Sequence, residues 1–171
     1  MRRWRAMVLT LVVIVAAALL GVRLYMSRAV EDGLQPGEQV DFARLALGAR
    51  DNVYLLCPRE PAICSAPPDG ASPVFALGAM ALRDRLLQMV AEEPRVRLIS
   101  EDAAHRHLVF IARSVLLRFP DIVTVEILPM GPGQSTLAIL SRSRYGRSDF
   151  GVNRRRVEAW IAKLKAVAQT P

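Results

Sequence analysis

The feature that most constrains this chain is an uncharged run of 17 residues near the N-terminus, residues 6–22. As a helix the run would extend roughly 25 Å at ~1.5 Å per residue. Trp4 and Tyr25 flank it and would lengthen it to about 30 Å, the thickness of a hydrocarbon core. Arginines precede the run, whereas Glu31 and Asp32 follow soon after it. This bias predicts a cytoplasmic N-terminus and an exported remainder.

A cleaved signal peptide would show the same basic start and apolar run, with a cleavage site at residues 27–29 or 16–18. Arg23 and Arg28 fit poorly before such a site, and the run is long for a signal peptide. We therefore predict a single-pass anchor in the inner membrane, with residues 1–28 as cytoplasmic tip and transmembrane helix and the folded part in the periplasm. Both alternatives remove the folded part from the cytoplasm, which argues against a nucleic-acid partner.

The net charge of +7 is unevenly distributed along the 171 residues. Residues 1–23 carry four arginines and no acidic residue, and residues 24–140 carry 11 basic and 14 acidic residues. Residues 141–171 carry eight basic and two acidic residues. The C-terminal block could therefore attract anions. The length suits one domain of ordinary size with a small appendage.

Two cysteines, Cys57 and Cys64, lie seven positions apart in the sequence CPREPAIC. In an exported domain such a pair is typical of one structural disulfide. Closing so short a loop would stabilise the fold by roughly 2–3 kcal/mol in the chain-entropy model. Metal binding would favour a closer pair together with a second pair, and redox chemistry would favour CxxC. Free thiols, a redox pair and a metal site remain the alternatives.

The remaining pattern predicts a wrapping segment and an α+β core. Residues 29–71 are rich in Pro and Gly, with a helical turn at residues 42–47 and a short strand at residues 53–56. Ser72 and Pro73 predict the start of a helix that Pro94 ends. Strands are predicted at residues 95–100, 105–118, 122–128 and 136–144, followed by a helix with Asn153 at its N-cap.

We therefore expect residues 72–171 to form a four-stranded antiparallel meander with two helices packed on one face, preceded in the chain by the transmembrane helix. His105 and His107 would share a face of the long second strand, as half of a metal site. No carboxylate or thiol is spaced to complete it, so we interpret them as solvated edge histidines. We predict no metal and no cofactor.

Residues 141–156, SRSRYGRSDFGVNRRR, hold six arginines and three serines between the last strand and the last helix. A cation in the first helical turn opposes the helix dipole and costs about 0.3–1 kcal/mol of stability. Such unfavourable placements are typical of functional sites or of sites where other contacts compensate for the cost. In the structural interpretation, the arginines form ion pairs with Asp149, Asp121 or Glu126 and so lock the strand to the helix. In the anion-binding interpretation the candidate residues are Arg142, Arg144, Arg147, Ser148, Asn153, Arg154, Arg155 and Arg156. The structural residues of the motif would be Ser141, Ser143, Gly146, Asp149 and Gly151.

The stretch from residue 135 to 164 resembles the uncharacterised family called domain of unknown function 1499. Its pattern is a strand ending in a Ser-Arg-Ser-like step, then Gly-x-Ser-Asp-x-Gly-Val-Asn-x-x-Arg-Val, which matches residues 141–157. Residues 113–121 and 52–58 are also similar, so the resemblance covers about residues 41–167. Members often carry N-terminal membrane segments. Their second cysteine is often followed by Val-Ser-Ser, whereas Ser65 and Ala66 follow Cys64 here. The resemblance implies no activity.

Three hypotheses follow. The first is a non-enzymatic, membrane-anchored domain of the bacterial envelope that binds an anionic lipid, a polyanion or an acidic protein at the arginine-rich junction. The second is a structural scaffold of an envelope complex. The third is a hydrolase-like enzyme that uses Ser141, Ser143, Ser148 or Asp149, for which neither histidine is placed as a base.

Overall fold

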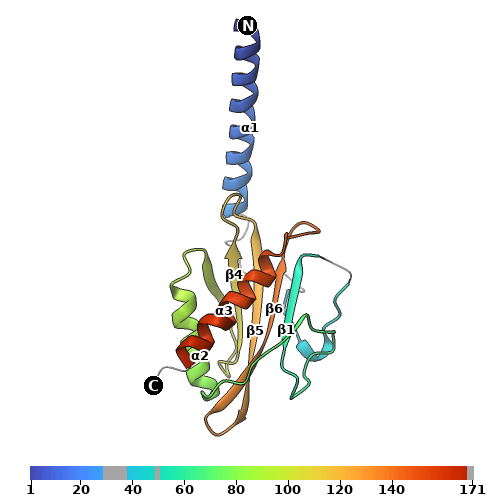
Figure 1. The fold of residues 1–171 in the computed structure, drawn as a ribbon, viewed down its shortest axis with the longest axis vertical. Coiled ribbons are helices and arrows are strands. Elements are labelled where there is room, and N and C mark those ends of the chain that lie inside the picture. The colour runs from blue at the N-terminus through green and yellow to red at the C-terminus, as the bar shows by residue number, and fades with distance from the viewer. Residues whose placement is uncertain (29–37, 49–50, 169–171) are drawn as a thin grey trace.

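The computed structural model describes residues 1–28, 38–48 and 51–168 (Figure 1). The long helix α1 (Arg2–Arg28) projects from an α+β domain that contains all the strands. The stretch Arg3–Arg28 includes an 18-residue window with a mean hydropathy of 2.6, no part of which is buried. α1 is therefore long and apolar enough to cross a membrane, a criterion that a signal sequence also meets.

The domain is built on one mixed sheet of six strands in the order β2-β1-β6-β5-β4-β3. Each of β3, β4 and β5 pairs antiparallel with the strand that follows it in the chain. β1 pairs antiparallel with β6, and β2 pairs parallel with β1. The predicted four-stranded antiparallel sheet is therefore wrong in strand number and in type. The strands are β1 (Val53–Cys57), β2 (Gly70–Ala71), β3 (Val96–Glu101), β4 (His107–Arg113), β5 (Pro120–Gly131) and β6 (Gln134–Ser143).

The two additional strands come from the segment that was expected only to wrap round the core. β1 is almost continuously buried, the pattern of a strand covered on both faces. It pairs with the edge of β6, from Val53 opposite Arg142 to Leu56 opposite Ile139. This pairing satisfies backbone groups that would otherwise form an exposed sheet edge.

Two helices, α2 (Ala79–Ala91) and α3 (Val152–Ala168), cover one face of the sheet (Figure 1). Leu82 and Leu86 from α2 and Trp160 from α3 are at most 2% exposed in the main core. Trp160 meets the ring of Phe110 edge-on, with 5.6 Å between ring centroids. Such aromatic pairs add about 0.5–1.5 kcal/mol beyond the area that they bury.

The opposite face of β1 and β6 is covered by the segment around the short 3-10 helix η1 (Phe42–Arg44). Phe42, 1% exposed, packs in a cluster with Leu55 and Leu140, and Asp41 accepts a hydrogen bond from the Ala43 N–H. Cys57 and Cys64 are disulfide-bonded, with Cα atoms 6.4 Å apart, beside the same cluster.

α2 begins at Ala79 with Gly78 at its N-cap, not at Ser72 as predicted. The preceding residues bond instead to β6. Phe75 and Ser135 exchange backbone hydrogen bonds of 2.7 and 3.1 Å, and Thr136 donates its hydroxyl to the Pro73 carbonyl. These long-range bonds hold the residues around Pro73 and Phe75 against β6, so the N-cap lies at Gly78 rather than at Ser72.

The strand predicted over residues 105–118 ends at Arg113, and the strand predicted from residue 122 begins earlier, at Pro120. Between them the Ser114 N–H bonds to the Phe119 carbonyl, and the Phe119 N–H bonds to the Ser114 hydroxyl. These bonds close a loop in which Arg118 adopts a φ of 63°. Val115 and Leu116, which looked like sheet residues, are 69% and 71% exposed at its tip.

Candidate functional site

The junction between β6 and α3 begins with a capping residue other than the predicted one. α3 starts at Val152, and the Asp149 carboxylate accepts the N–H groups of Gly151 at 2.8 Å and Asn153 at 2.6 Å. Asp149 thus satisfies helix-terminal N–H groups and places a negative charge where the helix dipole favours one. The assignment of Asn153 as the N-cap is wrong, because α3 already begins at Val152 and the buried Asn153 side chain bonds to Ser141 and Asn52.

Asn153 is the centre of a buried polar network. Its Oδ1 accepts hydrogen bonds from the Ser141 hydroxyl at 2.6 Å and from Arg156 Nη1 at 2.7 Å. Its Nδ2 donates to the Asn52 carbonyl at 3.0 Å and to the Ser143 hydroxyl at 3.1 Å. One amide therefore joins β6, α3 and the residue before β1, with donors and acceptors all used.

Arg156 connects this network to β5. Its Nη2 donates to Asp121 Oδ2 at 2.5 Å, and its Nη1 also donates to the Ser141 hydroxyl at 3.0 Å. The other Asp121 oxygen accepts the Ser143 hydroxyl at 2.7 Å. The side chains of Arg156 and Asp121 are 12% and 7% exposed. Because a charge in such a place is costly without a partner, each stabilises the fold only together with the other.

Arg142 and Arg144 lie on the opposite face of the sheet from Ser141 and Ser143, because side chains alternate along a strand. Arg144 forms a two-point ion pair with Glu38, with 2.5 Å between Nε and Oε1 and a second contact through Nη2. Arg142 donates to the Glu38 carbonyl at 2.8 Å. These two arginines fasten the segment at residue 38 to β6, away from Arg156.

The other candidate arginines lie on the surface. Arg154 pairs with Glu158 one turn along α3 at 2.8 Å, and Arg155 donates to the Phe150 carbonyl at 3.0 Å. Arg147 and Ser148 are exposed, and Arg147 has no side-chain hydrogen bond or ion pair with a described residue. The eight candidate residues are thus divided between two faces of the sheet and a loop.

The loop of the motif turns at its two glycines. Gly146 and Gly151 have φ values of +88° and +73°, in the left-handed region that glycine adopts without strain. A Cβ on Gly151 would also lie 3.2 Å from Arg155 Nη1. The Asn52 side chain donates to the Gly146 carbonyl at 2.7 Å and holds the loop against the start of β1.

A cavity of about 310 Å³ lies beside this loop, with Phe119, Tyr145 and Phe150 among its lining residues. Ser143 and Ser148 also line it, but no histidine does. The Ser143 hydroxyl donates to a carboxylate that is paired with Arg156, and both oxygens of Asp149 accept backbone N–H groups. A nucleophilic serine needs a base positioned to take its proton, and the described residues around this cavity supply no free one.

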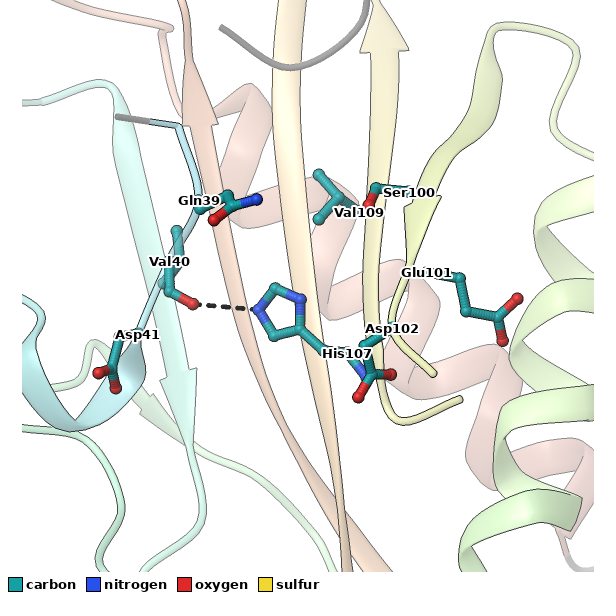
Figure 2. Close-up of a pocket in the computed structure, with 8 residues that line it drawn as sticks. All are labelled: Gln39, Val40, Asp41, Ser100, Glu101, Asp102, His107 and Val109. Atoms are coloured by element: carbon teal, nitrogen blue, oxygen red, sulfur yellow. Dashed lines mark hydrogen bonds between the residues drawn. The ribbon is translucent and has the colours of Figure 1, made fainter. Parts of the chain in front are cut away.

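The two histidines do not share a strand face as expected, because only His107 belongs to β4; His105 is exposed, as the interpretation of solvated histidines expects, and His107 is half-buried. His107 begins β4 and bonds through Nε2 to the Val40 carbonyl at 3.0 Å, across a cavity of about 470 Å³ (Figure 2). His105 precedes the strand with a φ of 55°, and its Nδ1 lies 3.0 Å from Glu101. Glu101 points away from His107 (Figure 2). Among the described residues, no group of three His, Cys, Asp or Glu side chains could hold a metal ion.

The acidic residues beside His107 have local structural partners. The Arg83 guanidinium, which donates to Glu101, lowers the pKa of that carboxyl, and His105 acts in the same direction. Backbone N–H groups of His107 and Arg106 lower the pKa of Asp102. Both carboxylates are held in the charged form by these bonds.

A second group of arginines, which the sequence did not single out, lies near the C-terminal end of α1. Arg95, Arg97, Arg113 and Arg118 line a cavity of about 400 Å³ together with Ser27. A weak sequence signal exists in retrospect. Arg95 and Arg97 are two residues apart within the strand predicted over residues 95–100, so their side chains share a face.

The fold and the junction define a class of protein. It is an α+β domain that follows an N-terminal apolar helix and has a buried polar network between its last strand and its last helix. The chain belongs to the family described as protein of unknown function (DUF1499), whose model matches residues 56–164. That range runs from β1 into α3 and includes the whole junction. No curated protein matches the chain.

Proposed function

We propose that this chain is a structural domain of the bacterial cell envelope, anchored by α1 in the inner membrane with its N-terminus in the cytoplasm and its domain in the periplasm. The apolar helix and the arginines that precede it support this orientation. A disulfide between Cys57 and Cys64 suits an oxidising compartment. The role is non-enzymatic: the domain presents a rigid surface for an envelope complex.

The observation that carries the proposal is the internal use of the junction's arginines. Arg156 bonds to Asp121, Ser141 and Asn153, and Arg144 pairs with Glu38. Buried polar networks whose members are all satisfied make a fold rigid and unique. The motif is therefore a structural lock between β5, β6 and α3.

An anion-binding role at the junction is the second candidate, restricted to its surface. Arg147 and Arg155 are exposed beside Ser148, and within the described part of the chain the Arg155 side chain makes a single hydrogen bond, to the Phe150 carbonyl. A polyanion or an acidic protein would bind this loop through exposed guanidinium groups. Arg147→Glu should then weaken retention on an anionic resin more than Arg59→Glu does, without changing thermal stability, and equal retention of the two variants would count against this role.

The structural lock is tested by Arg156→Ala. The substitution leaves Asp121 charged and buried without its partner, so we expect a loss of about 3–5 kcal/mol in the free energy of unfolding. Denaturant unfolding of the full chain in detergent, followed by near-UV circular dichroism, measures the loss. The matched control is Arg155→Ala, one residue away and exposed, for which we expect a change within about 0.5 kcal/mol. Equal stability of the two variants would refute the lock.

A double variant shows whether the stability lost in Arg156→Ala comes from the ion pair or from the hydrogen bonds. Arg156→Met combined with Asp121→Leu removes both charges and keeps apolar volume, so it should recover part of the stability lost in Arg156→Ala. No recovery would show that the hydrogen bonds to Ser141 and Asn153, rather than the ion pair, carry the lock.

The proposed orientation is tested by protease treatment of intact spheroplasts. The domain should be digested from outside, and a fragment containing α1 should stay in the membrane after a carbonate wash. Complete protection of the domain, or release of the whole chain by the wash, would contradict the anchored periplasmic arrangement.

A further inference from the structure

The C-terminal turns of α1 are bonded to the loop between β4 and β5. Arg23 Nη1 donates to the carbonyls of Val115 at 3.2 Å and Leu116 at 2.7 Å. Arg113, at the end of β4, donates to the Met26 carbonyl at 2.7 Å. The loop therefore lies against the end of α1, at the top of the domain in Figure 1.

These contacts define how far the β4–β5 loop lies from the hydrocarbon core of a membrane that α1 would cross. The uncharged run ends at Val22, so Arg23 marks the boundary of the hydrocarbon core, and the exposed Val115 and Leu116 lie level with it. Ser27 follows five residues after Val22, about 7 Å along the helix. The headgroup layer on each side of a bilayer is roughly 5–7 Å thick. Ser27 is therefore at the level of the lipid phosphates.

At this level lies the cavity of about 400 Å³ that four arginines line together with Ser27, Pro94, Val96 and Ile111. No carboxylate is among these lining residues. Arg97 pairs in register with Ile111, and Ile111 lies two residues before Arg113, so these side chains share the face of the sheet opposite α2 and α3. The loop that contacts α1 supplies Arg118.

Three of these arginines have no partner among residues 1–28, 38–48 and 51–168. Arg95, Arg97 and Arg118 make no side-chain hydrogen bond or ion pair there, while Arg113 is held by the Met26 carbonyl and forms a wall of the cavity. Like charges gathered in one place repel, and an anion between them removes that cost. The planar guanidinium group binds phosphate oxygens in a two-point geometry.

We propose that this cavity binds the phosphate group of an anionic phospholipid from the leaflet next to the domain. The inference adds a binding role to the structural role proposed above and takes from it only the membrane anchor. A lipid is favoured over a soluble anion because the cavity lies at headgroup depth and because Val115 and Leu116 beside it would enter the acyl boundary. The bound lipid would fix the orientation of the domain on the membrane.

The test is native mass spectrometry of the full chain in detergent, titrated with phosphatidylglycerol. We expect the wild-type chain to retain one lipid molecule. Arg95→Gln combined with Arg97→Gln should weaken retention about 100-fold, since each charged hydrogen bond contributes about tenfold or more. The control is Arg59→Gln combined with Arg85→Gln, the same charge change at two exposed arginines outside the cavity, which should retain the lipid. Equal retention by the two double variants, or none by the wild type, overturns the proposal.

Two further arms identify the ligand. Inorganic phosphate at the lipid's own concentration should not displace phosphatidylglycerol, and phosphatidylcholine should not replace it. Displacement by phosphate would assign the cavity to a soluble anion, and equal retention of phosphatidylcholine would remove the charge argument. Glu31→Gln combined with Asp32→Asn neutralises the nearest acidic residues after α1 in the sequence. If only this variant binds the lipid, the arginines form ion pairs with the chain's own carboxylates in the wild type, and the proposal fails.

The outcome is distinguishable from failure of the structural lock. Without lipid, Arg95→Gln combined with Arg97→Gln should unfold at the wild-type denaturant concentration, because exposed side chains away from the core contribute little. A loss of stability in that variant would mean that lipid loss follows from unfolding, and it would overturn the assignment of these arginines to a binding site.

Discussion

Two groups of three arginines on this domain have opposite surroundings. Arg142, Arg144 and Arg156 at the β6–α3 junction each bond to a carboxylate or a carbonyl. The α1-proximal group, Arg95, Arg97 and Arg118, has no such partner among the described residues. The difference shows that a dense run of arginines in a sequence is not by itself a binding site. Whether partners converge in space decides between a structural and a binding role.

The two groups occupy different places in the sheet. The junction lies where β1, β5, β6 and α3 meet, and this crossing brings in Asp121 and Glu38 from 35 and 106 positions away. The α1-proximal group lies on and just before the edge strand β3 and on the loop between β4 and β5, where fewer elements pack. An edge strand and an exposed loop leave these guanidinium groups open to an external anion.

The strongest additional test of this contrast is Arg144→Ala. The side chains of Arg144 and Glu38 are 5% and 13% exposed, so removing the arginine takes a two-point ion pair away from a nearly buried carboxylate. We expect a loss of about 3 kcal/mol in the free energy of unfolding, at the low end for a buried pair. Urea unfolding of the full chain measures the change, and Arg118→Ala is the control from the α1-proximal group, expected to change stability by no more than about 0.5 kcal/mol. Equal effects at both positions would remove the contrast.

A smaller effect is expected from Asp149→Ala. This carboxylate accepts the N–H groups of Gly151 and Asn153 at the start of α3, and its loss should cost about 1–2 kcal/mol, as for other capping residues. Asp149→Asn should keep part of the stability, since the amide oxygen still accepts a hydrogen bond. If Asp149→Ala were as stable as the wild type, the motif's aspartate would have a role other than capping.

The smallest effect on stability is expected for a third kind of arginine, Arg83, which is paired but partly exposed. Arg83 lowers the pKa of Glu101 by donating to it, so the stabilisation is present above the unfolded-state pKa of that carboxyl and is lost as the pH falls through the folded value. Arg83→Gln should therefore flatten the acid limb of the stability profile between about pH 6 and pH 3. Parallel profiles of variant and wild type, measured as urea midpoints, would contradict this role.

The sequence predicted the elements that depend on local pattern. The long apolar run gave α1, and periodic apolar residues located α2, α3 and the four strands of residues 96–143. Prediction failed where a partner distant in the chain decides the structure. Ser135 holds the residues around Phe75 extended, and β6 recruits β1 into the sheet. No periodicity within one segment contains that information.

The sequence by itself determined that residues 141–156 would be a dense polar junction between a strand and a helix, and it named Asp121 among the expected partners. Only the tertiary structure decided that Asn153 is buried, that Glu38 pairs with Arg144, and that the arginines divide between two faces. It also gathered Arg95, Arg97 and Arg118 at the end of α1. The physical reason is that spacing fixes which face a side chain occupies, whereas the charges it meets there come from elements far along the chain.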